Sequence, residues 1–339
     1  FSKMDGLFYY LADREWGVAF RENFGHEFSG LVSLTSKGNH MDRMLLSGLE
    51  REDWLRISGE LMTQVTDGVV DQAQKALPEP IRSNSGQVIS DKLKSRRKHL
   101  TKFVDDYYLY LAKEVDVIGT NKKEIIDVER LPNGNTHVQM RRKKDNEILY
   151  DRTFKYDETD EVRIYGLGGK DSIYIHGESY RNILVRLMGG KGKDRLTDVS
   201  TVKIGRKRTR IYDYTDGVKV ESSGETRILL SSSTFLNEYD HMAHKSDAYL
   251  PIPLFLSNPD DGIGGGFALT TQTFGFGHES FESSTTFKLF STTNGSNRIS
   301  LKHKRNFERT DWYFTSSMDF GNSFQYYRFY GAGHNTVLN

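Results

Sequence analysis

The sequence contains no cysteine, and only 6 of its 339 residues are proline. Without cysteine, disulfide bonds and thiolate chemistry are excluded, while the redox compartment stays undetermined. No stretch approaches the roughly 18 consecutive apolar residues that a membrane-spanning helix needs. A transmembrane β-barrel is not excluded, because its strands alternate and escape a hydropathy average. An excess of charge is also lacking, with 47 Lys and Arg against 46 Asp and Glu, so we expect no nucleic-acid partner.

Hydrophobic residues make up only 36% of the chain, and the mean hydropathy is −0.61. The aromatic content of 12% and the excess of glycine over proline nevertheless argue against disorder. The length leaves room for two or three domains. The chain begins at Phe1, without an initiating Met or a signal peptide, and we expect it to be part of a longer protein.

Residues 1–113 have the apolar spacing that is typical of helices. The longest helix is expected over about residues 85–112, with one face buried and a cationic face opposite. The expected buried residues are Leu93, Leu100, Phe103, Val104, Tyr107 and Leu111, and the cations are Lys94, Arg97 and Lys98. Two interpretations of the cations stay open, a solvated helix face and a face that binds phosphate or a membrane surface.

Residues 114–250 change to the period of two that is typical of strands. Within them a short motif occurs three times, at spacings of 23 and 24 residues. Its aligned residues are Arg163, Arg186 and Arg210 on one strand, and Ile173, Leu196 and Val218 on the return strand. A strand–turn–strand repeat of this length predicts the stacked coils of a short β-solenoid.

The turns of this repeat are rich in glycine. Residues 189–197 (GGKGKDRLT) fit the calcium-binding nonapeptide of solenoid toxins, and residues 166–173 are an imperfect copy. Asp171 and Asp194 are therefore candidate ligands for Ca²⁺. Consecutive calcium-binding copies follow one another about every nine residues, whereas these aspartates are 23 residues apart and have lysines beside them. Tight turns whose Asp side chains cap the backbone are the competing interpretation.

No catalytic constellation is recognisable, since the sequence has no Walker loop, no G-x-S-x-G and no H-E-x-x-H. Asp240, His241 and His244 form the densest group of titratable residues. A His pair three residues apart fits one helical turn, but such a pair is often incidental. We therefore expect no catalytic residue in this chain, and no cofactor besides the Ca²⁺ candidate.

Residues 251–339 are predicted to form strands of another kind. Prolines mark the boundary, and four stretches of eight to thirteen residues alternate in hydropathy beyond it: 264–276, 283–292, 298–305 and 311–320. This length suits a tilted strand that crosses a bilayer. The face expected to contact lipid consists of Phe287, Leu289, Ile299, Leu301, Trp312, Phe314 and Met318, and the other face carries Lys288, Lys302 and Asp319. A lipocalin-like barrel or a sandwich shows similar alternation and stays open.

Two segments resemble the opening of a BamA-like (bacterial surface antigen) outer-membrane barrel. Residues 250–266 (LPIPLFLSNPDDGIGGG) are similar to the entry into its first strand, and residues 328–336 (RFYGAGHNT) to the element after its fourth. Tyr330 stands where the family has a second Phe, and His334 is an insertion. The positions that match the family motifs are Asn258, Pro259, Asp260, Asp261, Gly262, Phe329, Gly331, Gly333, Asn335 and Thr336.

Roughly residues 70–200 resemble the segment that precedes this barrel in large outer-membrane proteins with an upstream calcineurin-like metallophosphoesterase region. The matching segments include residues 94–98 (KSRRK), 111–115 (LAKEV), 165–169 (YGLGG) and 189–194 (GGKGKD). The phosphoesterase metal ligands have no matching positions here.

The patterns and the resemblance predict an α+β protein. Its parts are a helical region (1–113), a β-rich, solenoid-like region (114–250) and the first strands of an antiparallel transmembrane β-barrel (251–339). The resemblance implies a place in the bacterial outer membrane, with the non-barrel part in the periplasm. It implies membrane lipid and other outer-membrane or periplasmic subunits as partners, and a structural, assembly or transport role. Two alternatives stay open: a secreted β-solenoid that binds calcium or glycans, and part of a phosphoesterase whose catalytic site lies upstream.

Overall fold

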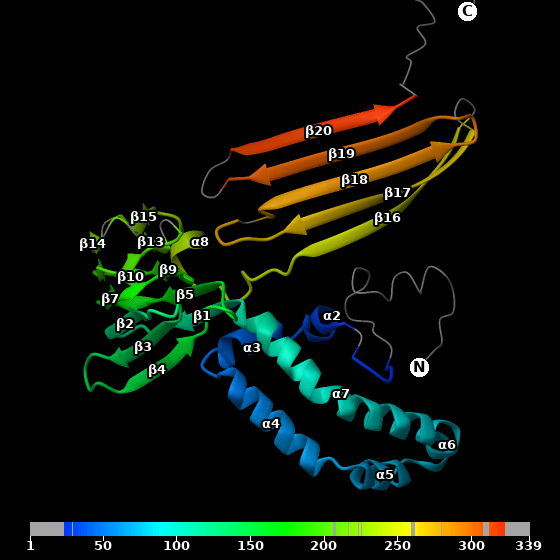
Figure 1. Ribbon diagram of the computed structural model, residues 1–339, viewed down its shortest axis with the longest axis horizontal. Coiled ribbons are helices and arrows are strands. Elements are labelled where there is room, and N and C mark those ends of the chain that lie inside the picture. Colours follow the sequence, from blue (N-terminus) through cyan, green and yellow to red (C-terminus); the bar gives the residue numbers. More distant parts are fainter. Residues whose placement is uncertain are drawn as a thin grey trace, which may run out of the picture. The chain divides into compact units, whose positions relative to one another are not determined.

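The computed structural model describes residues 24–28, 30–205, 208–215, 217–222, 224, 226–258, 262–278, 280–307 and 312–322. The fold is mixed α+β (Figure 1). Contacts divide the chain into two units, residues 1–244 and 245–339, so the helices and the solenoid-like region pack together as one unit. Within the described ranges, no helix is long and apolar enough to cross a membrane.

The helices precede the strands of the first unit, apart from one short helix near its end. They are α2 (Leu31–Thr35), α3 (Asn39–Leu45), α4 (Arg51–Gln64), α5 (Asp67–Lys75), α6 (Glu79–Ile81), the π-helix η1 (Arg82–Gly86), α7 (Gln87–Ala112) and α8 (Thr234–Asn237). A capping box of Glu50 and Asp53 starts α4. The Thr66 side chain accepts a hydrogen bond from the Val69 amide and starts α5. These caps explain why α4 and α5 are separate helices although only two residues divide them.

The long helix α7 lies alongside α4 (Figure 1), and the prediction of one unbroken helix over this region is confirmed. Of the residues expected to be buried, Tyr107 and Leu111 are buried, whereas Leu100, Phe103 and Val104 are half-buried. The predicted burial of Leu93 is wrong, because this side chain is 39% exposed. Instead, Lys94 and Arg97 turn toward α5, where they form ion pairs with Asp71 and Asp67 of 2.6 Å and 2.7 Å. The N-terminal half of α7 therefore contacts its neighbour through charged groups.

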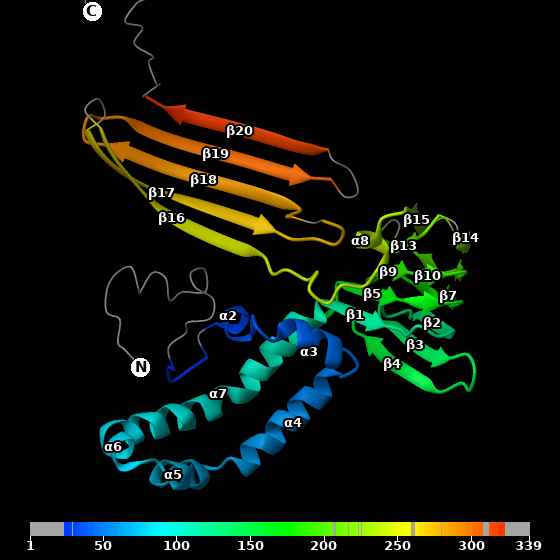
Figure 2. The same ribbon diagram turned by 180° about the vertical axis from the view of Figure 1, so that it is seen from behind.

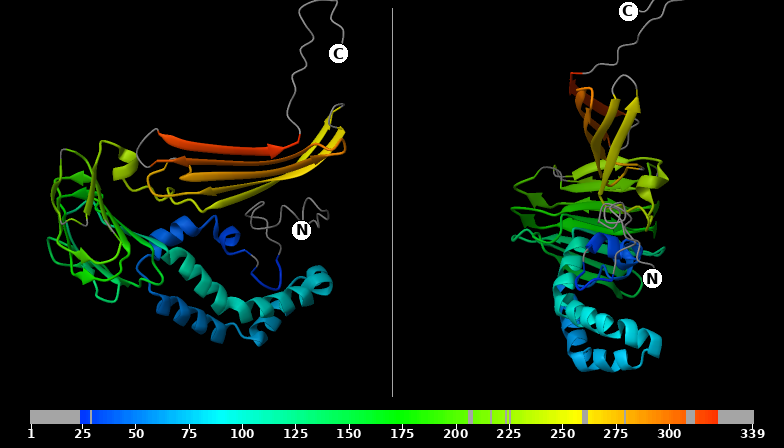
Figure 3. Two further views of the ribbon diagram at one scale, coloured as in Figure 1. Left: turned by 45° about the horizontal axis from the view of Figure 1, so that its top comes forward. Right: turned by 90° about the vertical axis from the view of Figure 1, so that its right-hand side faces the viewer.

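Fifteen strands in the described part of the first unit follow the long helix, most of them short. They are β1 (Glu114–Ile118), β2 (Glu124–Arg130), β3 (Thr136–Arg142), β4 (Ile148–Phe154), β5 (Glu161–Tyr165), β6 (Gly168–Gly169), β7 (Ser172–His176), β8 (Glu178–Ser179), β9 (Leu184–Met188), β10 (Lys191–Gly192), β11 (Arg195–Asp198), β12 (Thr201–Val202), β13 (Thr209–Asp213), β14 (Lys219–Ser222) and β15 (Thr226–Leu230). One sheet has the order β1-β5-β9-β13-β15 and the other β14-β11-β7-β2-β3-β4. The strands of the two sheets alternate along the chain and form stacked coils joined by turns (Figure 3), as the repeat predicted.

The parallel registers confirm the arginine alignment, since Arg186 lies opposite both Arg163 and Arg210. On the return strand Leu196 pairs with Ile173 as predicted, but its other partner is Val220. The predicted partner Val218 is two residues too early, because the return strand keeps the same distance from the arginine strand in each coil, eight residues from Met188 to Leu196 and from Tyr212 to Val220. The coil interior is a continuous apolar core. It contains Val115, Val117, Ile126, Val128, Val138, Met140, Phe154, Val162, Ile164, Ile173, Ile175, Ile183, Val185, Leu187, Leu196 and Ile211.

The second unit contains a five-stranded antiparallel meander (Figure 2). Its strands are β16 (Ala248–Asn258), β17 (Gly262–Thr273), β18 (Ser283–Thr292), β19 (Asn297–Asn306) and β20 (Tyr313–Gly321). The four predicted strands correspond to β17–β20 and are confirmed, with ends shifted by up to three residues.

The first strand of this meander, β16, is absent from the sequence-based prediction. Pro251 and Pro253, which were read as a boundary, lie inside it, and the chain divides at Lys245 instead. A proline cannot donate a backbone hydrogen bond and is therefore confined to the edge of a sheet. The strand is at the edge of the described sheet, and two prolines two residues apart direct their nitrogens to the same side. We infer that this side is the one away from β17.

Candidate functional site

Three groups of side chains are candidates for a functional site: buried carboxylates in the turns of the solenoid, a charged junction between the helices and the solenoid, and the two faces of the sheet β17–β20. The first contains the predicted calcium ligands. The second was missed by the sequence-based prediction. The third carries the alternating residues of the predicted barrel strands.

The buried carboxylates form a ladder with one acid on each coil. Glu124, Asp171 and Asp194 occupy the same position on three successive coils, immediately before or at the start of a strand of the second sheet. Their neighbours hold them through the backbone: the Glu124 amide donates to Asp171 Oδ1 and the Asp171 amide to Asp194 Oδ1, both at 2.8 Å. Asp213 is the fourth member, and its Oδ1 accepts from the Tyr214 amide at 2.6 Å. We call these four residues the carboxylate ladder.

The predicted calcium ligands are engaged by the backbone of neighbouring coils. Among the described residues, no group of three or more His, Cys, Asp or Glu side chains is arranged to hold a metal ion. Asp171 and Asp194 bind backbone amides, as the competing interpretation of capped turns predicts. The neighbouring lysines, including Lys170 and Lys193, are exposed on the outside of the coil, while the aspartates are buried inside it. The lysines therefore do not crowd the carboxylates, contrary to the sequence-based argument.

Two ladder carboxylates each keep one oxygen without a hydrogen-bond partner in the described structure, Oδ2 of Asp171 and Oδ2 of Asp213. Burial raises the pKa of Asp171 to about 8; the Glu124 amide opposes this rise, and the neighbouring carboxylates add to it. Burial likewise raises the pKa of Asp213 to about 7. A buried carboxyl without a cation is more stable in its neutral form. Asp171 and Asp213 therefore hold protons near neutral pH.

A second set of buried charges lies on the outer face of the first sheet. Arg163 and Arg186 both bind Glu161 Oε1 through Nε, at 2.5 Å and 2.8 Å. Arg163 also binds Glu114, at 2.6 Å, and His244 Nδ1 lies 3.3 Å from the same carboxylate. Burial opposes ionisation of Glu114, but His244 and Arg163 overcome it and lower its pKa to about 2. These arginines are therefore neutralised within the fold.

The predicted histidine pair does not form a site. His244 is used in the contact with Glu114, and the ring of His241 lies 5.9 Å from that of His40. No metal-binding group includes either residue within the described ranges.

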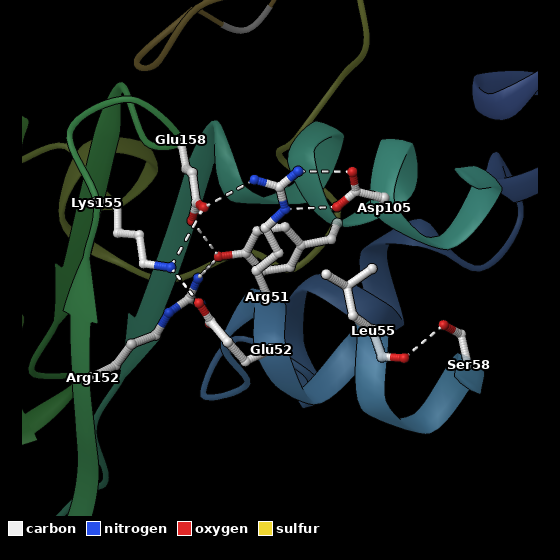
Figure 4. Close-up of polar contacts among 9 residues, drawn as sticks. Arg51, Glu52, Leu55, Ser58, Asp105, Arg152, Lys155 and Glu158 are labelled. Carbon is white, nitrogen blue, oxygen red and sulfur yellow. Dashed lines mark hydrogen bonds and ion pairs between the residues drawn. The ribbon is translucent and has the colours of Figure 1, made fainter. Parts of the chain in front are cut away.

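A network of charged and polar side chains joins α4, α7 and the loop after β4 (Figure 4). Arg51 donates to both oxygens of Asp105 on α7, at 2.6 Å and 2.7 Å, and lies 3.6 Å from Glu158. The Tyr108 hydroxyl donates to Glu158 at 2.8 Å and accepts from Arg152 at 3.1 Å. Hydrogen bonding to Asp105 raises the pKa of Arg51 above its usual range, and burial does the same for Tyr108. We call this network the helix junction.

The helix junction lies beside a small pocket that is partly open to solvent. Its charged lining residues already have partners: Asp42 accepts from the Tyr107 hydroxyl at 2.5 Å, Arg43 donates to backbone carbonyls, and Arg152 binds the carbonyl of Ser47. The junction thus holds the helices on the solenoid. Sequence spacing could not reveal it, since its members lie up to 107 positions apart, from Arg51 to Glu158.

The sheet β17–β20 has one apolar and one polar face. Its registers place Phe267, Leu289, Ile299 and Phe320 in one row across the four strands. The adjacent row on the same face consists of Leu269, Phe287, Leu301 and Met318. We call these eight residues the apolar band. Alternation places Lys288, Lys302 and Asp319 on the opposite face, as predicted. Trp312 precedes β20, so the register does not fix its face.

The residues that match the barrel-family motifs lie mostly outside the described residues. Asn258 ends β16 and Gly262 begins β17, where its φ of +75° suits glycine. The other motif positions fall outside: Pro259, Asp260, Asp261, Phe329, Gly331, Gly333, Asn335 and Thr336.

Comparisons with known proteins add no relative. No family model matches the sequence, and no significant match was found among curated proteins or solved structures.

Proposed function

We propose that residues 245–339 contribute the first strands of a β-barrel in a bacterial outer membrane, and that residues 1–244 form an accessory module in the periplasm. The apolar band carries this proposal. Seven of its eight members are exposed although they are large and apolar, from 37% for Phe287 to 61% for Phe320, and Leu269 is half-buried. Contiguous apolar surface of this kind needs a membrane or a partner to cover it.

The rest of the sheet agrees with this proposal. Strands β17–β20 have 9 to 12 residues, close to the length at which a tilted strand crosses a bilayer. The face opposite the apolar band is rich in Ser, Thr and Lys, as expected of the interior of such a barrel. An open sheet edge in lipid leaves backbone groups unpaired. Further strands, from this protein or from another subunit, must therefore complete the barrel.

The module contains buried charges that neutralise one another. Its role in this proposal is structural, in assembly or transport, in contact with other outer-membrane or periplasmic subunits. The helix junction supports such a role because it fixes the helical arm rigidly on the solenoid.

A pair of substitutions at neighbouring residues tests the proposal. Leu301→Arg places a charge in the apolar band, whereas Ser300→Arg places the same charge on the polar face. In lipid, an arginine at mid-membrane costs about 2–4 kcal/mol on the outer face of a barrel. The complete protein, expressed in a Gram-negative host, should resist extraction from outer membranes by urea. Leu301→Arg should reduce the membrane-bound amount several-fold, and Ser300→Arg should leave it nearly unchanged. Release of the wild-type protein by urea would contradict the proposal.

A further inference from the structure

The polar face of β17–β20 carries more positive charge than its own acids can balance. Its charged residues within the described strands are Lys288, Arg298, Lys302, Lys304 and Asp319. Asp319 is engaged by Arg298, whose Nε and Nη2 lie 3.2 Å and 3.1 Å from Oδ1. The three lysines therefore have no carboxylate partner on the described part of this face.

The lysines form a compact group that spans β18 and β19. Lys302 and Lys304 are two residues apart on β19, which separates their Cα atoms by about 7 Å. Lys288 lies opposite Ser300, so it is a diagonal neighbour of Lys302 across the two strands. Such neighbours are about 7–8 Å apart. Lys288 and Lys302 are exposed, and the Lys304 ammonium lies 4.4 Å from the centre of the Tyr313 ring.

Nearly all direct cross-strand neighbours of these lysines carry hydroxyl groups. They are Ser300 for Lys288, Thr286 and Ser317 for Lys302, and Ser284 and Thr315 for Lys304, with Ala268 as the one exception. A lysine on a sheet is ordinarily balanced by an acid on the neighbouring strand. Here the neighbours are hydroxyl groups, which donate hydrogen bonds but bring no negative charge. The surface is therefore complementary to an anion that has several oxygen atoms.

We propose that this lysine and hydroxyl surface binds a solute with several phosphate groups. Lysine binds phosphate as a point charge, and the neighbouring hydroxyl groups can donate hydrogen bonds to its oxygens. Three lysines in a row, each Cα about 7–8 Å from the next, favour a multivalent anion over a single phosphate. The inference rests on the proposed barrel, in which the apolar band faces lipid. The lysines then face the aqueous interior, so the anion is a dissolved solute and not a lipid headgroup.

Tripolyphosphate is the probe, and its binding to the complete protein is measured by titration calorimetry in detergent at low and at physiological salt. The test variant is the triple substitution Lys288→Gln, Lys302→Gln and Lys304→Gln. Its matched control is Arg305→Gln, which removes a cation from β19 on the opposite face. We expect at least a tenfold weaker affinity in the triple variant and less than a twofold change in the control. Wild-type affinity should fall as salt rises, and a single phosphate should bind far more weakly than tripolyphosphate.

The same preparations separate this inference from the proposed function. Equal binding by the wild type and the triple variant would show that the lysines do not bind the anion, whatever the result of the urea extraction. Stronger binding to vesicles of anionic lipid than to tripolyphosphate overturns the assignment to a solute. If urea releases the wild-type protein from membranes while binding still depends on the lysines, the barrel is wrong and the anion surface stands. Urea-resistant protein and binding that needs the lysines support both.

Discussion

The backbone amide of Asp171 donates a 2.8 Å hydrogen bond to Oδ1 of Asp194, the residue in the same position on the next coil. One coil earlier, the Glu124 amide makes the same contact with Asp171. The Asp171 side chain thus accepts a hydrogen bond from the coil before it, and its amide donates one to the coil after it. This accounts for buried acids in a solenoid without invoking a metal.

The first prediction concerns Oδ1 of Asp194, the acceptor for the Asp171 amide. Asp194→Asn keeps an oxygen for the Asp171 amide and should cost less than about 1 kcal/mol, whereas Asp194→Ala leaves a buried amide unpaired and should cost about 1–3 kcal/mol. Hydrogen exchange of solenoid peptides in the complete protein measures both effects. Millimolar Ca²⁺ or a chelator should change neither result. A melting temperature raised many degrees by Ca²⁺ would restore the calcium interpretation.

The second prediction is a pH dependence of the solenoid. The pKa of Asp171 is about 8 and that of Asp213 about 7 in the folded protein, both raised by burial from an ordinary value of 3.8. At a pH between 3.8 and these folded-state pKa values, the two carboxyl groups keep protons in the folded state that they have released in the unfolded state. The stabilisation is therefore complete below about pH 4 and is lost as pH rises to 8. We expect a loss of at least about 2 kcal/mol between pH 5 and pH 8.

Asp171→Asn cannot titrate and should flatten this dependence, while the exposed Asp157→Asn should preserve it. Hydrogen exchange of the solenoid at matched intrinsic exchange rates measures the slope. Solenoid stability that rises with pH in the wild type would show that the ladder is ionised in the folded protein.

The third prediction concerns the glycine turns. Gly190 has a φ of +86°, and a Cβ there would be too close to the Leu167 carbonyl on the preceding coil. Gly190→Val should therefore destabilise the solenoid by more than about 2 kcal/mol, with or without Ca²⁺. Gly59→Ala in α4 is the control, because a Cβ meets no atom within 4 Å there. It should stabilise by about 0.5–1 kcal/mol. A harmless Gly190→Val would show that the turn is not constrained by the coil before it.

The fourth prediction concerns the helix junction. Glu158 is 8% exposed and accepts from the buried Tyr108 hydroxyl. Glu158→Ala should cost about 1–3 kcal/mol and loosen the packing of α4 on α7, since it leaves this hydroxyl unpaired. Lys102→Ala, which breaks an exposed pair with Asp106 on the same helix, should change stability by less than about 0.5 kcal/mol. Hydrogen exchange of α4 and α7 peptides distinguishes the two, and equal effects would mean that the junction is not a specific anchor.

The sequence contained enough to predict the features that repeat or alternate. The arginine alignment, the strands β17–β20 and the unbroken helix α7 each follow from a local period. Glu124 was missed, although it precedes Ile126 by two residues as Asp171 precedes Ile173 and Asp194 precedes Leu196. The match is not evident in the sequence because strands β3 and β4 are inserted between the first coil and the second, so the spacing from Glu124 to Asp171 is longer than one repeat.

Other features depend on contacts that no local period encodes. β16 was missed because proline ordinarily ends a strand, and only the position of the strand at a sheet edge permits two of them. The burial of Leu93 was wrongly predicted because the partners of Lys94 and Arg97 lie on α5. In the N-terminal half of α7, the face toward α5 is therefore the one with these cations, and Leu93 is exposed. The helix junction depends on residues from α4, α7 and the loop after β4, so it exists only in the folded chain.

The fifth prediction concerns orientation. If residues 245–339 begin a barrel of the proposed kind, the chain before them lies at its periplasmic rim, and residues 1–250 are shielded from outside the cell. Trypsin added to intact cells should then leave this part uncut, although Lys98, Lys102, Lys170 and Lys193 are exposed on its surface. Permeabilising the outer membrane should make the same part sensitive, which shows that its sites are open to the protease. Fragments are identified by mass spectrometry, and a periplasmic marker protein reports leakage. Cleavage within residues 1–250 in intact, marker-tight cells would reverse the orientation. The turn 293–297 follows the third strand, β18, so the proposed orientation places it outside the cell and the reversed one in the periplasm.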